Sequence, residues 1–329
     1  MAGLAFVALS FVALVAAGCS DDGSDVSSPS STSGAPSSST TTVADTAPTS
    51  SEGCGTPPAV GAVAEVPHDV PLSLRLPDGT ERTYRLGIPD GYDPATPAPL
   101  VVNLHGSGSN ALEQSIYSDM AGRAGARGMI TVTPDAIDGK WELGPTGADA
   151  DFLDALVDQV AAGYCVDPGR IHLAGMSLGA WKSAITACTE PERYASIALV
   201  TVEVHPPGCA PTSVVAFHGT ADRTVPYGEG SDPGITVSGP NALLPGARDN
   251  IRSWAESAGC DPEPAEEPIG TDVVHWTFGG CDDGVGVELY TVTGGGHTWP
   301  GAAVTIGATT DTIDATDLAL DWFEAHPHR

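Results

Sequence analysis

The alternation of apolar strands with amphipathic helices limits the fold of this chain more than any other feature. From residue 98 onward, short apolar runs typical of strands buried on both faces alternate with segments of helical spacing. Strands joined through helices lie parallel in one sheet, with helices on both faces. The sequence therefore predicts an α/β fold with a mostly parallel sheet. The expected strands are 98–106, 129–135, 170–175, 196–202, 213–219 and 287–294, and the expected helices are 111–128, 147–164, 176–189, 246–259 and 315–327.

An antiparallel hairpin precedes this alternation. Residues 71–89 alternate apolar and polar side chains around Asp78-Gly79, a dipeptide typical of tight hairpin turns. No internal repeat is visible in the sequence. We expect residues 54–329 to form one domain with a single core, because their number is ordinary for one domain.

Ser177 lies between a predicted strand and a predicted helix, in the segment RIHLAGMSLGAW of residues 170–181. The pentapeptide G-x-S-x-G alone is a weak indication, because the chain contains 40 glycines. The strand–turn–helix context is what the nucleophile elbow of an α/β-hydrolase requires. Gly175 and Gly179 suit that turn, since side chains there would collide across it. The sequence therefore predicts that Ser177 is a catalytic nucleophile.

Two backbone amides are candidates for an oxyanion hole. The Leu178 N–H stands at a predicted helix N-terminus, where unpaired amides and the helix dipole favour an anion. The Ser107 N–H follows the predicted strand 98–106, on the loop HGSGSN. Acyl transfer requires such donors where negative charge develops. We expect His105 to support this loop rather than to take part in the chemistry.

A serine nucleophile needs a base and an acid, which follow it in the order Ser, Asp, His in this fold. Asp222 lies on the loop after a buried strand, in FHGTADRTVPY. His297 lies on the glycine-rich loop after the last predicted strand. We therefore expect Asp222 to orient His297, and His297 to take the Ser177 proton. The other acids fit less well, because no predicted strand precedes Asp232, Asp249 or Asp261. The other histidines also fit less well: His275 lies inside a likely strand, and His218 precedes Asp222 and would break the order. His326 and His328 lie at the chain terminus.

Aromatic residues give a weaker indication of the substrate. Trp299 lies two residues after His297, and Trp141 lies in a loop at the expected carboxyl edge of the sheet. Either can stack on an aryl group of a substrate, or pack in the core instead. Residues 224–246 are rich in Gly and Pro and form either a flap over the site or a long surface loop.

The N-terminal region predicts export. Residues 1–18 form an apolar run that is too short for a membrane span and suits a signal peptide. The following VAAGCS resembles a bacterial lipobox, which predicts lipidation of Cys19; the alternative is a plain signal peptide. Residues 19–53, rich in Ser, Thr, Pro and Ala, are expected to form a disordered, lipid-anchored tether. The protein is then a cell-surface lipoprotein or extracellular.

Six cysteines remain if Cys19 is lipidated, and an even number in an exported chain suggests three disulfides. Fifteen pairings are possible in principle. We favour Cys188–Cys209 and Cys260–Cys281, because each pair brackets a short excursion between predicted elements. Cys54–Cys165 follows by elimination.

The composition limits the partners. A net charge of −29 argues against binding to nucleic acid or to anionic membrane surfaces. No zinc-ligand spacing is present, so no metal or other cofactor is expected. The expected partners are an ester substrate, small or polymer-linked, and a membrane through the lipid anchor only. The sequence does not predict the oligomeric state.

Four of these segments are distinctive when taken together: LHGSGSN, RIHLAGMSLGA, FHGTADRTVPY and GGGHTWPG. Together they resemble the polyhydroxybutyrate depolymerase and feruloyl esterase group of α/β-hydrolases. The layout of the chain resembles that of the bacterial lipoprotein members of this group. The resemblance implies hydrolysis of carboxylic esters through an acyl-enzyme, with Ser177, Asp222 and His297 in the roles given above. It implies feruloyl-type aryl esters, hydroxyalkanoates or short acyl esters as substrates. Two other functions remain open: a serine peptidase of the same fold, and a catalytically weak surface-binding lipoprotein.

Overall fold

The computed structural model describes residues 50–328. The predicted signal peptide, the predicted lipidation site Cys19 and nearly all of the predicted tether lie outside the described residues. Among the residues that are described, no helix is both long and apolar enough to cross a bilayer.

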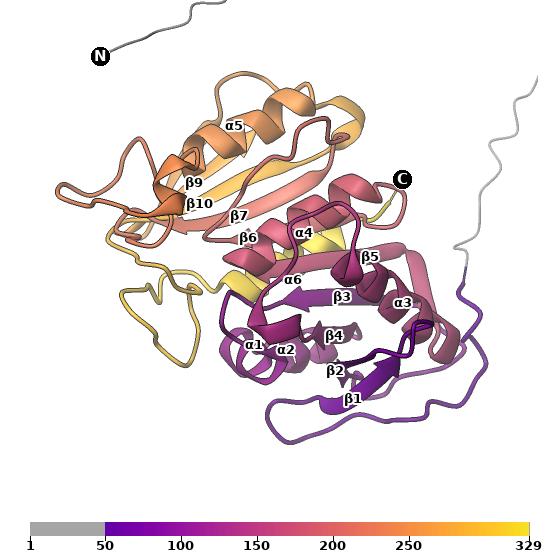
Figure 1. The fold of residues 1–329 in the computed structure, drawn as a ribbon. Coiled ribbons are helices and arrows are strands. Elements are labelled where there is room, and N and C mark those ends of the chain that lie inside the picture. Colours follow the sequence, from indigo (N-terminus) through magenta and orange to yellow (C-terminus); the bar gives the residue numbers. More distant parts are fainter. Residues whose placement is uncertain (1–49, 329) are drawn as a thin grey trace, which may run out of the picture. The chain divides into compact units, whose positions relative to one another are not determined.

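One ten-stranded sheet forms the centre of the domain, in the order β1-β2-β4-β3-β5-β6-β7-β10-β9-β8 (Figure 1). The six strands from β4 to β10 are parallel to one another, and antiparallel pairs lie at both edges. This arrangement confirms the predicted α/β-hydrolase fold and its N-terminal antiparallel hairpin. The strands are β1 (Val70–Arg75), β2 (Glu81–Gly87), β3 (Ala98–Leu104), β4 (Ile130–Pro134), β5 (Val166–Met176), β6 (Ser196–Val200), β7 (Ser213–Gly219), β8 (Ala265–Ile269), β9 (Val273–Phe278) and β10 (Val287–Val292).

Helices cover both faces of the sheet, which explains why its central strands are mostly apolar and buried. Alternate residues of β7 contribute to two separate cores, Val214 and Ala216 to one and Val215 and Phe217 to the other. Residues of α3, α4 and α5 belong to the first core, and residues of α1, α2 and α6 to the second. The helices are α1 (Ala111–Ser118), α2 (Met120–Ala126), α3 (Ala148–Gly163), α4 (Leu178–Thr189), α5 (Ala247–Ser257) and α6 (Ala315–Ala325), with short 3₁₀ turns η1 (Ile137–Gly139), η2 (Pro240–Leu243) and η3 (Asp282–Gly284).

Two elements differ from the prediction. The single helix expected over 111–128 is broken at Asp119, whose φ of 50° is left-handed. The Ser118 hydroxyl donates to the Gln114 carbonyl and lies 3.3 Å from the Met120 N–H, so a side chain replaces backbone bonds at the break. Strand β8 was not predicted, because its residues AEEPI are mostly exposed and lack an apolar alternation.

The N-terminal end of the described chain is fastened to the domain. Ser51 N–H donates to the Val166 carbonyl, and Gly53 N–H donates to the Ala161 carbonyl. Residues just before the predicted boundary at 54 therefore also contact the domain, at the start of β5 and the end of α3.

All three predicted disulfides are present: Cys54–Cys165, Cys188–Cys209 and Cys260–Cys281. The first closes a separation of 111 residues and joins the N-terminal segment to the start of β5. The other two each close 21 residues. Three disulfides in one domain are typical of proteins that fold outside the cytosol.

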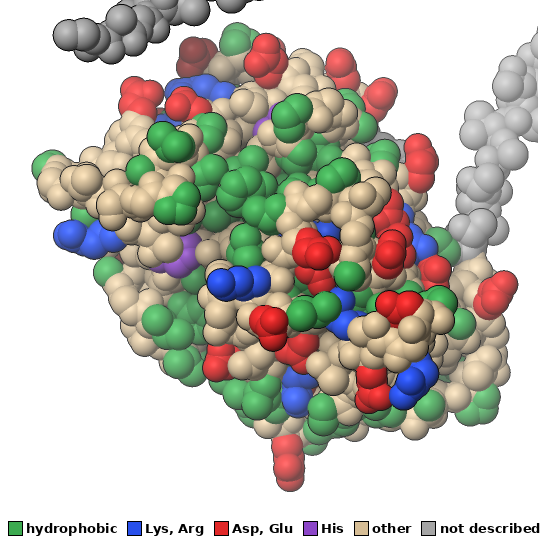
Figure 2. All heavy atoms as spheres, in the orientation of Figure 1, with side chains coloured by type: hydrophobic (Ala, Val, Ile, Leu, Met, Phe, Trp, Pro, Cys, Tyr) green, Lys and Arg blue, Asp and Glu red, His purple; other side chains and the backbone are tan. Residues whose placement is uncertain are grey.

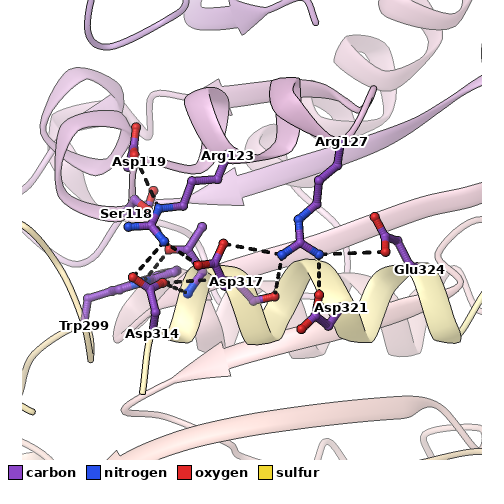
Figure 3. A network of polar contacts seen from close by, with 10 residues as sticks. Ser118, Asp119, Arg123, Arg127, Trp299, Asp314, Asp317, Asp321 and Glu324 are labelled. Atoms are coloured by element: carbon purple, nitrogen blue, oxygen red, sulfur yellow. Dashed lines mark hydrogen bonds and ion pairs between the residues drawn. The ribbon is translucent and has the colours of Figure 1, made fainter. Parts of the chain in front are cut away.

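A network of ion pairs joins α2 to α6 (Figure 3). Arg123 contacts both Asp314, the N-cap of α6, and Asp317, at 2.8 and 2.7 Å. Arg127 pairs with Asp317 and Asp321 along the same helix. The network fixes the helix that follows the His297 loop. Elsewhere acidic side chains are spread widely over the surface, as Figure 2 shows for one face.

Candidate active site

Ser177 occupies a sharp turn between β5 and α4. Its φ of 55° and ψ of −119° lie in a region that side chains rarely adopt, which is the strained geometry of a nucleophile elbow. A Cβ on Gly175 would lie 2.5 Å from the backbone of Gly179, and a Cβ on Gly179 would lie 2.3 Å from the Leu104 carbonyl oxygen. The two glycines therefore permit the close approach of strand and helix, as the sequence predicts.

The two predicted oxyanion amides lie beside Ser177. Leu178 is the first residue of α4, and Ser107 lies on the loop after β3. A Cβ on Gly106 would be 3.4 Å from the Ser177 Cβ, so this loop passes directly over the serine. Within residues 50–328, neither the Ser107 N–H nor the Leu178 N–H donates to another protein group. Both amides are thus free to receive a substrate oxygen.

His105 supports this loop, as predicted. Its Nδ1–H donates to the Gly106 carbonyl at 2.8 Å, and its Nε2 accepts from the Ala136 N–H at 3.0 Å. One donor and one acceptor role require a neutral ring. Burial lowers the pKa of His105, which is consistent with that state.

Asp222 and His297 are brought together from loops that lie far apart in the sequence. His297 Nδ1 lies 2.7 Å from Asp222 Oδ2. The other carboxylate oxygen accepts from the N–H groups of Thr224 and Val225 at 2.7 and 3.0 Å. These contacts fix the Asp222 carboxylate and leave Nε2 as the basic nitrogen of His297. Burial would raise the pKa of Asp222, but contacts with His218 and His297 outweigh burial and lower it.

Ser177 and His297 face the same cavity, of about 430 Å³. No hydrogen bond joins the Ser177 hydroxyl to His297 in the described part of the chain, although such bonds often shorten only when substrate binds. The cavity is lined by Gly106, Ser107, Ser109, Glu113, Gln114, Ile116, Tyr117, Met176, Ser177, His297, Val304 and Ile306.

Trp141 and Trp299 do not line this cavity, so of the two roles considered for each, the structure shows packing in the core and not stacking on the substrate. Trp141 is buried, and its indole N–H donates to the His105 carbonyl at 2.9 Å. Trp299 is also buried, and its indole N–H donates to Thr316 at 2.9 Å. Both indoles therefore pack under the site and support its loops. The loop 224–246 does not line the cavity either, and it forms a surface segment with the 3₁₀ turn η2.

Two buried polar residues next to Asp222 were not predicted to belong to the site. His218 Nε2 lies 3.4 Å from Asp222 Oδ2, and His218 Nδ1 lies 2.7 Å from Glu203 Oε1. His218 and Glu203 both lie in the interior. The sequence signal for His218 was its place in the strand that leads to Asp222, but nothing in the sequence indicates that Glu203 reaches it.

The ion pairs of His218 should make the fold less stable at alkaline pH. Burial alone would lower the pKa of His218, but Glu203 and Asp222 outweigh burial and raise it to about 10, above the unperturbed 6.5. A group with a higher pKa in the folded state stabilises the fold below its unfolded pKa, and this contribution is lost as the pH rises through the folded pKa. Tm should therefore fall between about pH 7 and about pH 10, and less so in His218→Gln; equal curves for both proteins would contradict this.

Comparisons with known proteins point to esterases. The chain is 30% identical over 277 residues to a protein of Nocardia uniformis subsp. tsuyamanensis named "Putative esterase NocK", covering 74% of this chain and 79% of that protein. It is 28% identical over 254 residues to feruloyl esterase C of Emericella nidulans, covering 74% of this chain and 84% of that protein. It is 31% identical over 225 residues to feruloyl esterase B of Piromyces equi, covering 64% of this chain but only 41% of that protein. No family model matches the chain.

A solved structure shares the fold. Acetyl xylan esterase from Aspergillus awamori superposes with a TM-score of 0.55 over 78% of this chain and 99% of that protein, at 17% identity. At this identity the likeness concerns the fold alone.

Proposed function

The chain belongs to the feruloyl esterase-like α/β-hydrolases and is a carboxylic-ester hydrolase, and we propose that it works as a serine esterase through Ser177, His297 and Asp222. The observation that carries the proposal is the His297–Asp222 pair, at 2.7 Å, on the wall of a cavity that also contains the strained serine. This is the order and arrangement of groups that serine acyl transfer requires.

The reaction follows from the position of each group. The Ser177 Oγ attacks the ester carbonyl carbon while His297 Nε2 takes the hydroxyl proton. The carbonyl oxygen becomes an oxyanion, which accepts from the Ser107 and Leu178 amides. The C–O bond to the alcohol then breaks, and His297 returns the proton to the leaving alkoxide. Water, deprotonated by His297, attacks the acyl-enzyme in the same way and releases the acid and the free serine.

The cavity favours an ester with a bulky apolar arm, such as an aryl group. Ile116 on α1 stands on its wall with Met176, next to the serine. Val304 and Ile306 also line it, although 47% and 58% of their surfaces stay exposed. Residues 303–306 make no hydrogen bond in the described part of the chain, and this segment presents only Val304 and Ile306 to the cavity. We call residues 301–307 the strap.

Replacing both strap residues, Val304→Ser and Ile306→Ser, should change selectivity. We expect kcat/KM for methyl ferulate to fall about ten-fold, because apolar contact with the aryl arm is lost. Turnover of methyl acetate should change less than about two-fold, since its small arms reach neither residue. Val66→Ser is the matched control, because Val66 is 70% exposed and does not line the cavity. An equal loss on both esters would refute selection by the strap.

A substrate panel tests the proposed function as a whole. The oxidised wild-type protein should hydrolyse methyl ferulate or hydroxybutyrate oligomers and leave aminoacyl amides intact. A fluorophosphonate reagent should label Ser177, which peptide mass spectrometry would locate. Labelling elsewhere, or cleavage of the amides in preference to the esters, would contradict an esterase that uses this serine.

We propose further that the protein is exported and held at the cell surface by a lipid on Cys19. The three disulfides support export, and the sequence VAAGCS supports the lipid. Detergent phase partitioning tests the anchor: the wild type should enter the detergent phase and Cys19→Ser should remain in water. Equal partitioning of the two proteins would exclude the lipid.

A further inference from the structure

A second acid–histidine pair lies behind the Asp222–His297 pair. Glu203, His218, Asp222 and His297 follow one another as alternating carboxylates and imidazoles. The successive contacts are 2.7 Å from Glu203 Oε1 to His218 Nδ1, 3.4 Å from His218 Nε2 to Asp222 Oδ2, and 2.7 Å from Asp222 Oδ2 to His297 Nδ1. The first three side chains are at most 1% exposed.

The surroundings of His218 determine its charge. Nδ1 is hydrogen-bonded to Glu203 Oε1, whereas Nε2 makes no hydrogen bond among the described residues but lies 3.4 Å from Asp222 Oδ2. Ionised carboxylates accept and cannot donate, so a proton on each ring nitrogen, and a positive charge on the ring, suits both neighbours. His105 shows the contrast, since one of its nitrogens faces an N–H group and its ring is neutral. The Tyr227 ring also stands edge-on to His218, with 5.6 Å between the ring centroids, and the Tyr227 hydroxyl accepts a hydrogen bond from Arg248.

The position of this pair is not explained by packing. Two carboxylates and an imidazolium in the interior lose more hydration than their attraction usually returns, so apolar residues would serve a core at least as well. Glu203 is also held from outside the site, because the indole N–H of Trp254 on α5 donates to its backbone carbonyl at 2.9 Å. A costly charged pair that contacts the carboxylate of the proposed triad indicates a role in the reaction.

We infer that His218, held by Glu203, is a positioning residue that fixes the Asp222 carboxylate and partly neutralises its charge. This inference rests on the proposed function of the same site. Without the cation, Asp222 would lose a partner on the oxygen that faces His297. It would also attract a proton on His297 more strongly, so that the base would become free only at higher pH. Neither effect involves contact between His218 and the substrate.

The test is the pH dependence of p-nitrophenyl acetate hydrolysis by His218→Gln. We expect the acid limb of kcat/KM to move to higher pH by about half a unit to one unit, because a nearby positive charge is removed. We expect kcat to fall about ten-fold and KM to change less than about two-fold, since substrate contacts are untouched. An acid limb at the wild-type pH, with kcat retained in the folded protein, would show that His218 only stabilises the fold.

Two further proteins and one measurement keep the test decisive. The double exchange Glu203→Gln with His218→Gln removes both members of the pair and leaves no unpaired charge at Glu203, so it should fold even if the single variant does not. The acid limb of its kcat/KM profile should also move to higher pH. His172→Gln removes another buried histidine, bonded to Ser196 on the neighbouring strand, and should leave the pH profile unchanged. Histidine NMR on the wild type should show both His218 ring protons at pH 7, and a neutral ring there would overturn the inference.

The outcome is separable from that of the proposed function. If Ser177→Ala hydrolyses p-nitrophenyl acetate as fast as the wild type, the serine mechanism fails whatever His218 does. If Ser177→Ala is inactive and His218→Gln matches the wild type at every pH, only the role of His218 fails.

Discussion

Exchanging Ser177 for alanine is expected to lower kcat for p-nitrophenyl acetate by on the order of 10³-fold or more. In the proposed mechanism, the exchange removes the atom that forms the acyl-enzyme and leaves the candidate oxyanion amides and the cavity in place. The fold should survive, because the Ser177 side chain lies at a cavity wall and makes no hydrogen bond in the described residues. His297→Ala should lower kcat by a factor of the same order, since serine without a base is a weak nucleophile.

The matched control is Ser183→Ala on α4, the helix that follows Ser177. Ser183 is buried and donates to the Ala174 carbonyl at 3.3 Å, but it does not line the cavity. Its exchange should leave kcat within about three-fold of the wild type, because no group of the proposed reaction is removed. A Ser177→Ala protein that keeps its far-UV circular dichroism and also its activity would exclude this serine as the nucleophile.

Gly179→Ala is expected to have the largest effect on stability, about 3 kcal/mol or more in the free energy of unfolding. The new Cβ would stand 2.3 Å from the Leu104 carbonyl oxygen and 2.5 Å from that of His105, and both are backbone atoms that cannot turn aside. Relief of the clash requires α4 to move away from β3. That movement would separate the Leu178 amide from the loop of Ser107, so activity should fall with stability.

Gly163→Ala controls for the general cost of replacing a glycine in a helix. Gly163 ends α3, and a Cβ there would meet no atom within 4 Å. Its exchange should be neutral or should stabilise the protein by about 0.5–1 kcal/mol, because alanine restricts the unfolded chain. Chemical denaturation measures both variants. Equal stability of Gly179→Ala and the wild type would mean that α4 leaves room for a Cβ beside the Leu104 carbonyl, contrary to the 2.3 Å separation.

The parts of the fold that could be predicted are those where local pattern and burial agree. Strands β3, β4, β6 and β7 are fully buried and mostly apolar because helices cover both faces, so nearly continuous apolar runs mark them. The elbow was predictable because its glycines stand on either side of Ser177 at fixed spacing. The disulfides were predictable because two of the pairs each enclose a short segment of 21 residues. Once those four cysteines are paired, only Cys54 and Cys165 remain to form the third disulfide.

The features that could not be predicted depend on contacts between distant segments. Glu203 lies on a loop with no signal of its own, and only the folded sheet brings it within 2.7 Å of His218. Val304 and Ile306 are apolar residues on a loop, and nothing in the sequence distinguishes a cavity wall from a surface segment. Trp141 and Trp299 lie close in sequence to site residues, but their indole N–H groups find acceptors under the site and turn the rings inward.

Ser51 and Ser177 lie at opposite ends of the same strand, β5. Ser51 bonds to Val166 at one end of that strand, and Ser177 follows its other end. Val166 and Gly175 pair with Ala98 and Leu104 of β3 across a bulge, so this part of β5 spans roughly 20 Å. The cavity at Ser177 and the bonds of Ser51 therefore lie at opposite ends of this strand, so the segment around Ser51 does not stand between the site and an approaching ester.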